Sequence, residues 1–282
     1  MSADKGTGLV ATQSTTGSFI GTIPQNYDTY LGPILFEFTG ADMARRVAAA
    51  FNGPARVLEV ACGTGISTRH LAGAFSAGSE IQATDLNDAM LDHAAKVNGA
   101  LPGVTYSQAD ALNLPFDDAS FDAVVCQFGI MFFPDKAKGM ADFARVLKPG
   151  GLLALNVWDG FEHNQTAGII DRVIKSHFET DPPRFLEAPF GSVTPEAGRS
   201  MIEASGLTEI TVDTVAEAIP VSDYSGIARG FITGNPTILE IQNRATVDPE
   251  TVIQSGITAL EAELGAPPAK LSFQETVFLA KR

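Results

Sequence analysis

The segment at residues 57–65 constrains the fold of this chain more than any other. It is an aliphatic run with Glu59 inside it, and it ends in a turn that contains Gly63 and Gly65. An acidic side chain inside a strand is costly unless a neighbour or a ligand needs it. Glycine lets backbone approach a ligand closely, and the helix expected at 66–75 points its free N–H groups at that ligand. A strand, a glycine turn and a helix N-terminus together predict a nucleotide-binding site.

Two glycine patterns are compatible with such a site. The dinucleotide pattern G-x-G-x-x-G requires a third glycine where this chain has Thr68. The observed order is an acid, a small residue and two glycines, at Glu59, Ala61, Gly63 and Gly65. This order resembles motif I of the class I S-adenosylmethionine-dependent methyltransferases. In that motif the first small position is usually glycine, and here it is alanine.

The next segments agree with the same family. A second expected strand ends at Asp85, 20 residues after the second glycine of the turn, where a carboxylate can accept both ribose hydroxyls. Asn87 is expected to cap the helix that follows. Leu86 and Met90 are then placed to sandwich an adenine ring.

Further along, a short strand is followed by Asp110 in a loop. This segment resembles the adenine-binding segment of the family, in which the acid accepts from the adenine amino group and the next backbone N–H meets the ring. The apolar residues 121–128 predict a fourth strand that is covered on both faces. The string ARVLKPGG before the strand at 152–158 also resembles the motif that follows the family's core.

The resemblance implies S-adenosylmethionine (SAM) as the cofactor. The residues expected to bind it are Tyr27, Glu59, Ala61, Cys62, Gly63, Gly65, Asp85, Leu86, Met90, Asp110, Ala111, Leu112 and Gln127.

The expected fold class is α/β. A Rossmann-like sheet of seven mostly parallel strands, the last one antiparallel, is flanked by helices and carries helical cap insertions. The expected domains are a disordered tail at 1–18, an N-terminal helical lid at 19–53, a SAM-binding core at 54–158, and the remainder of the sheet at 159–282. The cap insertions are expected at 159–206 and 220–265.

The acceptor site is expected outside the core. The segment at 19–53 is dense in aromatic residues and resembles that of a bacterial and fungal subgroup near the ubiquinone/menaquinone C-methylases. In related small-molecule methyltransferases, a helix before the core folds over the cofactor and substrate. The expected substrate-pocket residues are Tyr30, Phe36, Phe128 and Phe132. The insertion at 220–265 packs beside the substrate entrance or forms a dimer surface, and the sequence does not separate these alternatives.

Charge and composition narrow the partners. The formal net charge is −14, and nucleic-acid binders need a basic footprint that is not visible here. No apolar run reaches the roughly 18 residues of a membrane span, and no signal peptide is seen. The two cysteines are expected to be buried thiols in a reducing cytoplasm. We therefore expect a cytoplasmic enzyme with a small-molecule substrate, no metal, no nucleic-acid partner and no membrane span.

Methyl transfer from SAM is an in-line displacement, so the protein mainly positions the nucleophile and excludes water. Histidine is the usual base near neutral pH. His163 is the candidate, because it follows the fifth strand at the edge where the active site is expected. Asp28 and Glu162 are alternative candidates for the base, whereas His70 and His93 are expected at the surface.

The expected function is SAM-dependent methyl transfer to an oxygen, nitrogen or carbon nucleophile of a small, apolar or aromatic molecule. One alternative is a protein of the same fold that uses SAM without transferring its methyl group, in a rearrangement or cyclisation. A second alternative is a nicotinamide-dependent oxidoreductase, against which Thr68 argues.

Overall fold

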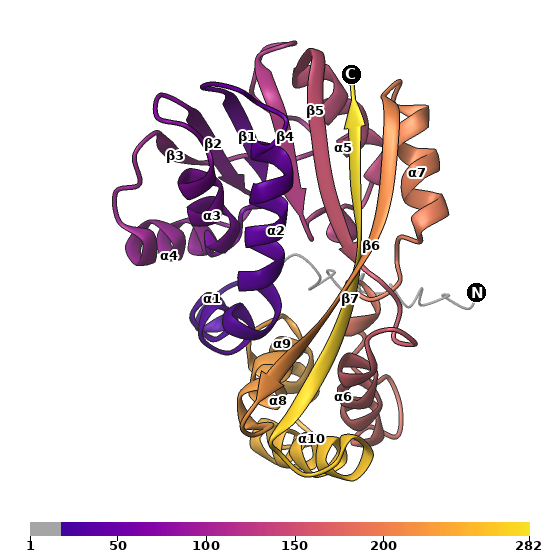
Figure 1. The fold of residues 1–282 in the computed structure, drawn as a ribbon. Helices are drawn as coiled ribbons and strands as arrows, with labels where there is room; N and C mark the ends of the chain where they lie inside the picture. Colours follow the sequence, from indigo (N-terminus) through magenta and orange to yellow (C-terminus); the bar gives the residue numbers. More distant parts are fainter. Residues whose placement is uncertain (1–17) are drawn as a thin grey trace, which may run out of the picture.

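The computed structural model describes residues 18–282, which form a seven-stranded sheet with helices on both faces (Figure 1). The strand order is β3-β2-β1-β4-β5-β7-β6. Only β7 runs antiparallel, to both β5 and β6, which confirms the predicted fold class. The strands are β1 (Arg56–Val60), β2 (Glu80–Asp85), β3 (Val104–Gln108), β4 (Phe121–Gln127), β5 (Leu147–Trp158), β6 (Thr208–Val221) and β7 (Ala269–Lys281).

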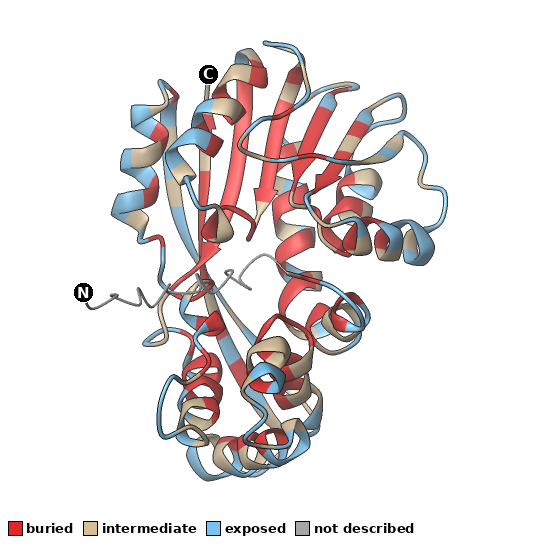
Figure 2. Cartoon of the chain, turned by 180° about the vertical axis from the view of Figure 1, so that it is seen from behind, coloured by how far each residue is buried: buried red, intermediate tan, exposed pale blue. Residues whose placement is uncertain are grey.

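The helices cover the sheet in two layers because alternate strand residues point to opposite faces. Val57, Ile81 and Ala123 pack against α2 and α3, whereas Leu58 and Val124 belong to the core that contains α5. Figure 2 shows the resulting concentration of buried residues along the central strands. The flanking helices are α2 (Glu37–Ala48), α3 (Ile66–Ala74), α4 (Asp88–Asn98), α5 (Lys136–Val146) and α7 (Pro195–Ala204).

The last two strands extend beyond the rest of the sheet. Their pairing continues from Val215–Glu275 to Val221–Ala269, past the end of β5 at Trp158. The sequence predicts β6 at 207–215, so it is longer than expected, because β7 supplies a partner along its whole length. The far end of this ribbon carries a group of helices (Figure 1): α6 (Gln165–Ser176), α8 (Ser225–Thr233), α9 (Thr237–Arg244) and α10 (Pro249–Leu264).

The segment before the core is helical almost throughout. It contains α1 (Ile23–Asn26), the π-helix η2 (Tyr27–Phe36) and α2. The helix that the sequence predicts at 41–51 in fact begins at Glu37 and ends at Ala48. Its start is earlier because η2 continues directly into it, the N–H of Glu37 donating to the carbonyl of Gly32. The tail predicted at 1–18 lies, except for Ser18, outside the described residues. No helix within residues 18–282 is both long and apolar enough to cross a membrane.

Candidate functional site

In the turn after β1, every second residue from position 61 to position 65 adopts the left-handed backbone conformation. Ala61, Gly63 and Gly65 have φ values of 57°, 57° and 79°. Glycine adopts this conformation without steric cost, whereas alanine does not. Ala61 is therefore a strained position, and this explains why related motifs usually carry glycine there.

The two glycines of the turn serve different purposes. A Cβ on Gly65 would collide with the side-chain amide of Asn98, which donates to the carbonyl of Gly65 at 3.0 Å. A Cβ on Gly63 would meet nothing within 4 Å. Gly65 thus packs against α4 and β3, and Gly63 exposes its backbone to open space.

Glu59 lies behind this turn and is only 1% exposed. Its carboxyl accepts a hydrogen bond from the hydroxyl of Ser67, and its Oε2 has no hydrogen-bond partner among the described residues. Burial raises the pKa of Glu59 to about 7, although the hydrogen bond from Ser67 opposes the shift. The structure thus buries Glu59 in contact with the start of α3.

Asp85, the last residue of β2, closes the turn from the neighbouring strand. Its Oδ2 accepts from the backbone N–H of Gly63 at 2.9 Å, and its Oδ1 accepts from the N–H of Asn87 at 2.8 Å. Burial raises the pKa of Asp85, and these backbone hydrogen bonds oppose the rise. The carboxylate is therefore held in one orientation at the carboxyl edge of the sheet.

A cavity begins at this edge and runs beneath η2. The cavity has a volume of about 190 Å³. A single water molecule needs about 10–15 Å³ on the same measure, so the cavity is large enough for an organic ligand. One end is lined by Ala61, Gly63, Asp85, Leu86, Asn87, Met90, Ala109, Asp110, Ala111 and Leu112. The other end is lined by aromatic and aliphatic side chains, among them Phe36, Phe128, Phe132, Trp158, Phe185, Phe190 and Phe231.

Most of the residues predicted from the sequence line this cavity. They are Tyr27, Phe36, Ala61, Gly63, Asp85, Leu86, Met90, Asp110, Ala111, Leu112, Gln127, Phe128 and Phe132. Five others do not line it: Tyr30, Glu59, Cys62, Gly65 and His163. Cys62 is buried, and burial raises its pKa well above the usual value, so it is an inert thiol.

The candidate bases lie away from the cavity. The His163 side chain is 52% exposed, and its ring nitrogen is 3.9 Å from the carboxylate of Glu162, which is itself 73% exposed. Asp28 accepts from the Thr64 hydroxyl at 3.4 Å and lies 3.5 Å from His93. The His93 side chain is only 18% exposed, so the expected surface position of His93 is wrong: its ring lies against Asp28 of η2.

Several residues of the aromatic end were not predicted from the sequence. Trp158 is the last residue of β5, and its ring stacks on Phe128 with centroids 4.1 Å apart and planes 7° apart. Its place at the carboxyl end of a parallel strand is a signal that sequence reasoning overlooked. Phe190 and Phe231 come from the two cap segments, and no local pattern distinguishes them from ordinary core residues.

Gln127 lines the cavity and contacts the predicted lid. Its Nε2 donates to the hydroxyl of Thr39 at 2.8 Å, and that hydroxyl lies 3.0 Å from the carbonyl of Leu35. Its Oε1 is buried without a hydrogen-bond partner among residues 18–282. The contact joins the end of β4 to the helices of the predicted lid.

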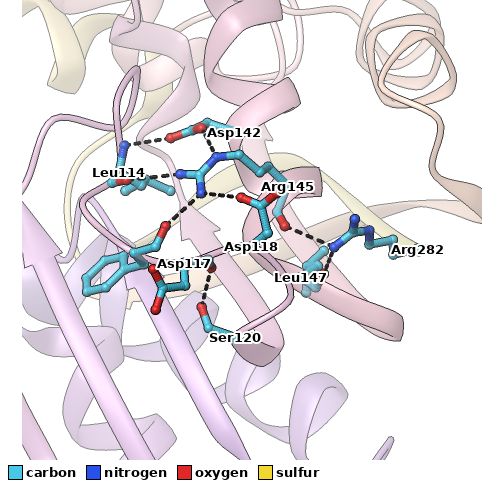
Figure 3. Close-up of polar contacts among 9 residues, drawn as sticks. Leu114, Asp117, Asp118, Ser120, Asp142, Arg145, Leu147 and Arg282 are labelled. Carbon is cyan, nitrogen blue, oxygen red and sulfur yellow. Dashed lines mark hydrogen bonds and ion pairs between the residues drawn. The ribbon is translucent and has the colours of Figure 1, made fainter.

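A network around Arg145 of α5 holds the loop that follows the Asp110 segment (Figure 3). The guanidinium donates to the carbonyl oxygens of Leu114 and Phe116 and to the carboxylates of Asp118 and Asp142. These two carboxylates raise the pKa of Arg145, so the group keeps its charge. The network fixes the course of the chain beside one wall of the cavity.

The first end of the cavity fits the adenosine part of SAM. A buried carboxylate at Asp85 can accept from ribose hydroxyls, and Leu86 and Met90 supply apolar surfaces for a flat base. Gly63 leaves its backbone accessible, since a Cβ there would point into open space. Among residues 18–282, no cluster of His, Cys, Asp or Glu is placed to hold a metal ion.

Comparison with known proteins identifies the family of the chain. Residues 58–155 match the model of a methyltransferase domain. A demethylmenaquinone methyltransferase from Deinococcus radiodurans is 39% identical over 144 residues, which are 50% of this chain and 58% of that protein. The chain thus covers less than two thirds of that relative. An uncharacterized protein from Mycobacterium bovis is 34% identical over 203 residues, 69% of this chain and 67% of that protein.

The fold has similar solved structures. The phosphoethanolamine N-methyltransferase 2 of Haemonchus contortus, in complex with SAM, matches with a TM-score of 0.60 and 17% identity, covering 96% of this chain and 60% of that one. At this identity the likeness is one of fold. The matched domain and the sequence relatives show that the chain belongs to the class I S-adenosylmethionine-dependent methyltransferases, whose cofactor is SAM.

Proposed function

We propose that this protein transfers a methyl group from SAM to a small, flat, apolar molecule. The observation that carries the proposal is one continuous cavity with two chemically different ends. Its first end presents Asp85 and the glycine turn, and its second end is almost entirely aromatic and aliphatic. The relatives that act on quinones, as their names state, support an aromatic acceptor.

In this proposal the residues of the first end hold the cofactor, which supplies an activated methyl group when bound. Asp85 accepts from the ribose hydroxyls, and Leu86 and Met90 enclose the adenine. Asp110 and the backbone of Ala111 and Leu112 face the edge of the base. Asp110 already accepts from the N–H of Leu112 at 2.8 Å, so its carboxylate is held in place by its own turn.

The second end orients the acceptor and excludes water. The titratable side chains among the cavity-lining residues are Tyr27, Asp85 and Asp110. Burial, and then the negative charges of Asp85 and Asp28, raise the pKa of Tyr27, so its phenol stays neutral and does not act as a base. In this proposal the acceptor therefore carries a nucleophile that reacts without a strong base from the described lining of the cavity.

His163 remains a predicted base. Because its side chain is exposed and outside the cavity lining, we expect a His163→Ala variant to keep most of its activity. A loss of about a hundredfold or more in kcat/KM would instead identify His163 as a base that moves into the site.

The proposal is tested with SAM that carries a labelled methyl group. The full chain is incubated with labelled SAM and a panel of planar acceptors that bear phenol, amine, thiol or activated-carbon groups. Labelled product and S-adenosylhomocysteine in equal amounts support methyl transfer. An altered acceptor without label, in a SAM-dependent reaction, would support the rearrangement or cyclisation alternative.

The nicotinamide alternative predicts the opposite binding preference. Calorimetric titration should show binding of S-adenosylhomocysteine and no binding of NAD(P).

We also propose a cytoplasmic location, because two free, buried thiols are typical of a reducing compartment. The dimer surface predicted at 220–265 remains one of two alternatives, and analytical ultracentrifugation of the full chain tests whether the protein is a homodimer.

A further inference from the structure

Glu275 is a buried acid on β7 that the functions described so far do not use. It is 2% exposed, and its Oε1 has no hydrogen-bond partner among the described residues. Its Oε2 accepts from the side-chain amide of Asn156, which is fully buried on β5. Burying an acid in a sheet is costly, and an apolar residue would pack there at lower cost. A residue kept at such a cost calls for a specific role.

The partner of Glu275 leads directly to the cavity. Asn156 accepts, through Oδ1, from the backbone N–H of Phe128 at 3.0 Å. Phe128 has φ of 55°, a left-handed conformation that is strained for a bulky residue. Such strain persists where the surroundings hold it, and here the N–H of Phe128 donates both to the side-chain oxygen of Asn156 and to its backbone carbonyl.

Glu275 determines which way the Asn156 amide faces. The amide nitrogen donates to the Glu275 carboxyl, so the amide oxygen is left to accept from Phe128. A flipped amide would set its N–H against the N–H of Phe128, which would then keep only its second hydrogen bond, to the backbone carbonyl of Asn156 at 3.2 Å. The acceptor on Glu275 therefore stabilises the one orientation that holds the backbone of Phe128.

The backbone of Phe128 sets the position of its ring, which stacks on Trp158 at 4.1 Å between centroids. Trp158 is also the register partner of Glu275 across the β5–β7 pair. Both rings line the second end of the cavity. The two rings together are called the aromatic platform below.

We propose that Glu275 is a positioning residue which, through Asn156, holds the aromatic platform against which the acceptor lies. The inference rests on the proposed function, because it assigns the acceptor to the second end of the cavity. It concerns only how the platform is held, so it is tested without methyl transfer.

The surroundings of Glu275 suit a neutral acid. Burial raises the pKa of Glu275 to about 8, the hydrogen bond from Asn156 opposes the shift, and Asp42 adds to it. The other charged groups facing it are Arg46 of α2, Asp159 after β5, and Glu217 of β6. Arg46 is paired with Asp42 and with Asp213. Above about pH 8 a negative charge would thus form beneath the predicted lid.

The chain offers a built-in reporter, since Trp158 is its single tryptophan. Acrylamide quenching of its fluorescence measures how well the platform is packed. N-phenyl-1-naphthylamine, an uncharged planar dye that brightens in apolar cavities, measures binding to the second end. Both are recorded on the full chain with S-adenosylhomocysteine present.

Three variants separate positioning from simple stability. Glu275→Leu removes the acceptor for Asn156, and Glu275→Gln keeps an acceptor on a neutral group. Thr276→Val is the matched control, because Thr276 is fully buried on the same strand and donates to Asp159 rather than to Asn156. We expect Glu275→Leu to weaken dye binding about fivefold and to increase quenching about twofold, with the other two variants close to the wild type.

The pH dependence gives a second measurement that needs no disruptive variant. Ionised Glu275 would still accept from Asn156, but a buried negative charge near Asp42, Asp159 and Glu217 is costly and should loosen the packing around it. Dye binding by the wild type should therefore weaken, and quenching should increase, as the pH rises through about 8, whereas Glu275→Gln should show neither change. This comparison decides the question if Glu275→Leu does not fold.

The inference is overturned if Glu275→Leu behaves like the wild type, or if Glu275→Gln and Thr276→Val lose dye binding as strongly as Glu275→Leu does. It is also overturned if the wild type and Glu275→Gln respond identically to pH. Failure of the wild type to bind the dye would contradict the proposed acceptor class instead, and the quenching series would still test the positioning role.

Discussion

At the scale of single residues, Ala61 in the turn after β1 lies against Gly129, which follows β4. A Cβ on Gly129 would lie 2.6 Å from the Cβ of Ala61 and 2.9 Å from the sulfur of Cys126. We expect Gly129→Ala to destabilise the fold by about 1–3 kcal/mol through overpacking. Ala61→Gly should be neutral or stabilising by up to about 1 kcal/mol, because it relieves the left-handed backbone.

Because the two residues touch, the double variant should be more stable than the sum of the single effects predicts. Urea unfolding of the four proteins measures this coupling. Gly53→Ala is the control, since a Cβ there meets nothing within 4 Å. Strictly additive effects would show that the collision with Ala61 is not what makes Gly129 necessary.

A second prediction at this scale concerns Asp85. Asp85→Ala removes the acceptor expected for the ribose hydroxyls, and the affinity for S-adenosylhomocysteine should fall at least about tenfold. The same change frees the N–H groups of Gly63 and Asn87, so Asp85→Asn, which keeps the shape, is measured beside it. Unchanged affinity in calorimetry for both variants would place the ribose elsewhere.

At the scale of elements, Arg145 joins α5 to the loop that follows Asp110. Arg145→Met removes four donated hydrogen bonds, so we expect a loss of about 1–3 kcal/mol in unfolding free energy. Hydrogen exchange of residues 112–120 should also become faster. Arg172→Met is the control, because the Arg172 side chain is 61% exposed in its pair with Glu263 and exposed pairs contribute about 0–1 kcal/mol. Equal losses in both variants would contradict the anchoring role.

The pre-core helices form the second element with a testable role. Tyr27 and Phe36 stack on each other and line the cavity, so a bound cofactor should order the segment that carries them. Residues 19–40 should gain protection from hydrogen exchange when S-adenosylhomocysteine is added. Exchange at the same rate with and without it would mean that this segment is a fixed wall rather than a lid.

At the scale of the whole molecule, two buried carboxyls link folding to pH. Burial raises the pKa of Glu59 to about 7 and that of Glu275 to about 8. An acid whose pKa is higher in the folded state binds more protons when folded, so its contribution is complete at low pH and is lost as the pH rises to the folded pKa. We expect the unfolding free energy to decline between about pH 5 and pH 8 through these two groups.

Glu59→Gln should make this decline shallower, and urea unfolding at several pH values measures it. Glu162→Gln is the control, because the Glu162 side chain is 73% exposed. If Glu59→Gln leaves the pH profile unchanged, Glu59 is ionised in the folded protein and something in its surroundings stabilises the charge.

The sequence by itself determined the order of strands and helices along the chain and most of the residues at the first end of the cavity. Turn glycines, alternating apolar residues and capping side chains act within a few residues of each other. The carboxyl ends of parallel strands also meet at one edge, so Asp85 and Asp110 could be assigned there before any contact was known.

Tertiary structure decided the rest. The aromatic end of the cavity is assembled from segments far apart in the chain, and Phe190 and Phe231 have no local pattern that separates them from core residues. The burial of Glu275 depends on Asn156, 119 residues away, and that of His93 depends on η2. These contacts cannot be predicted from residues adjacent in sequence. They arise when helices and strands pack, and packing depends on the shape and volume of side chains across the whole core.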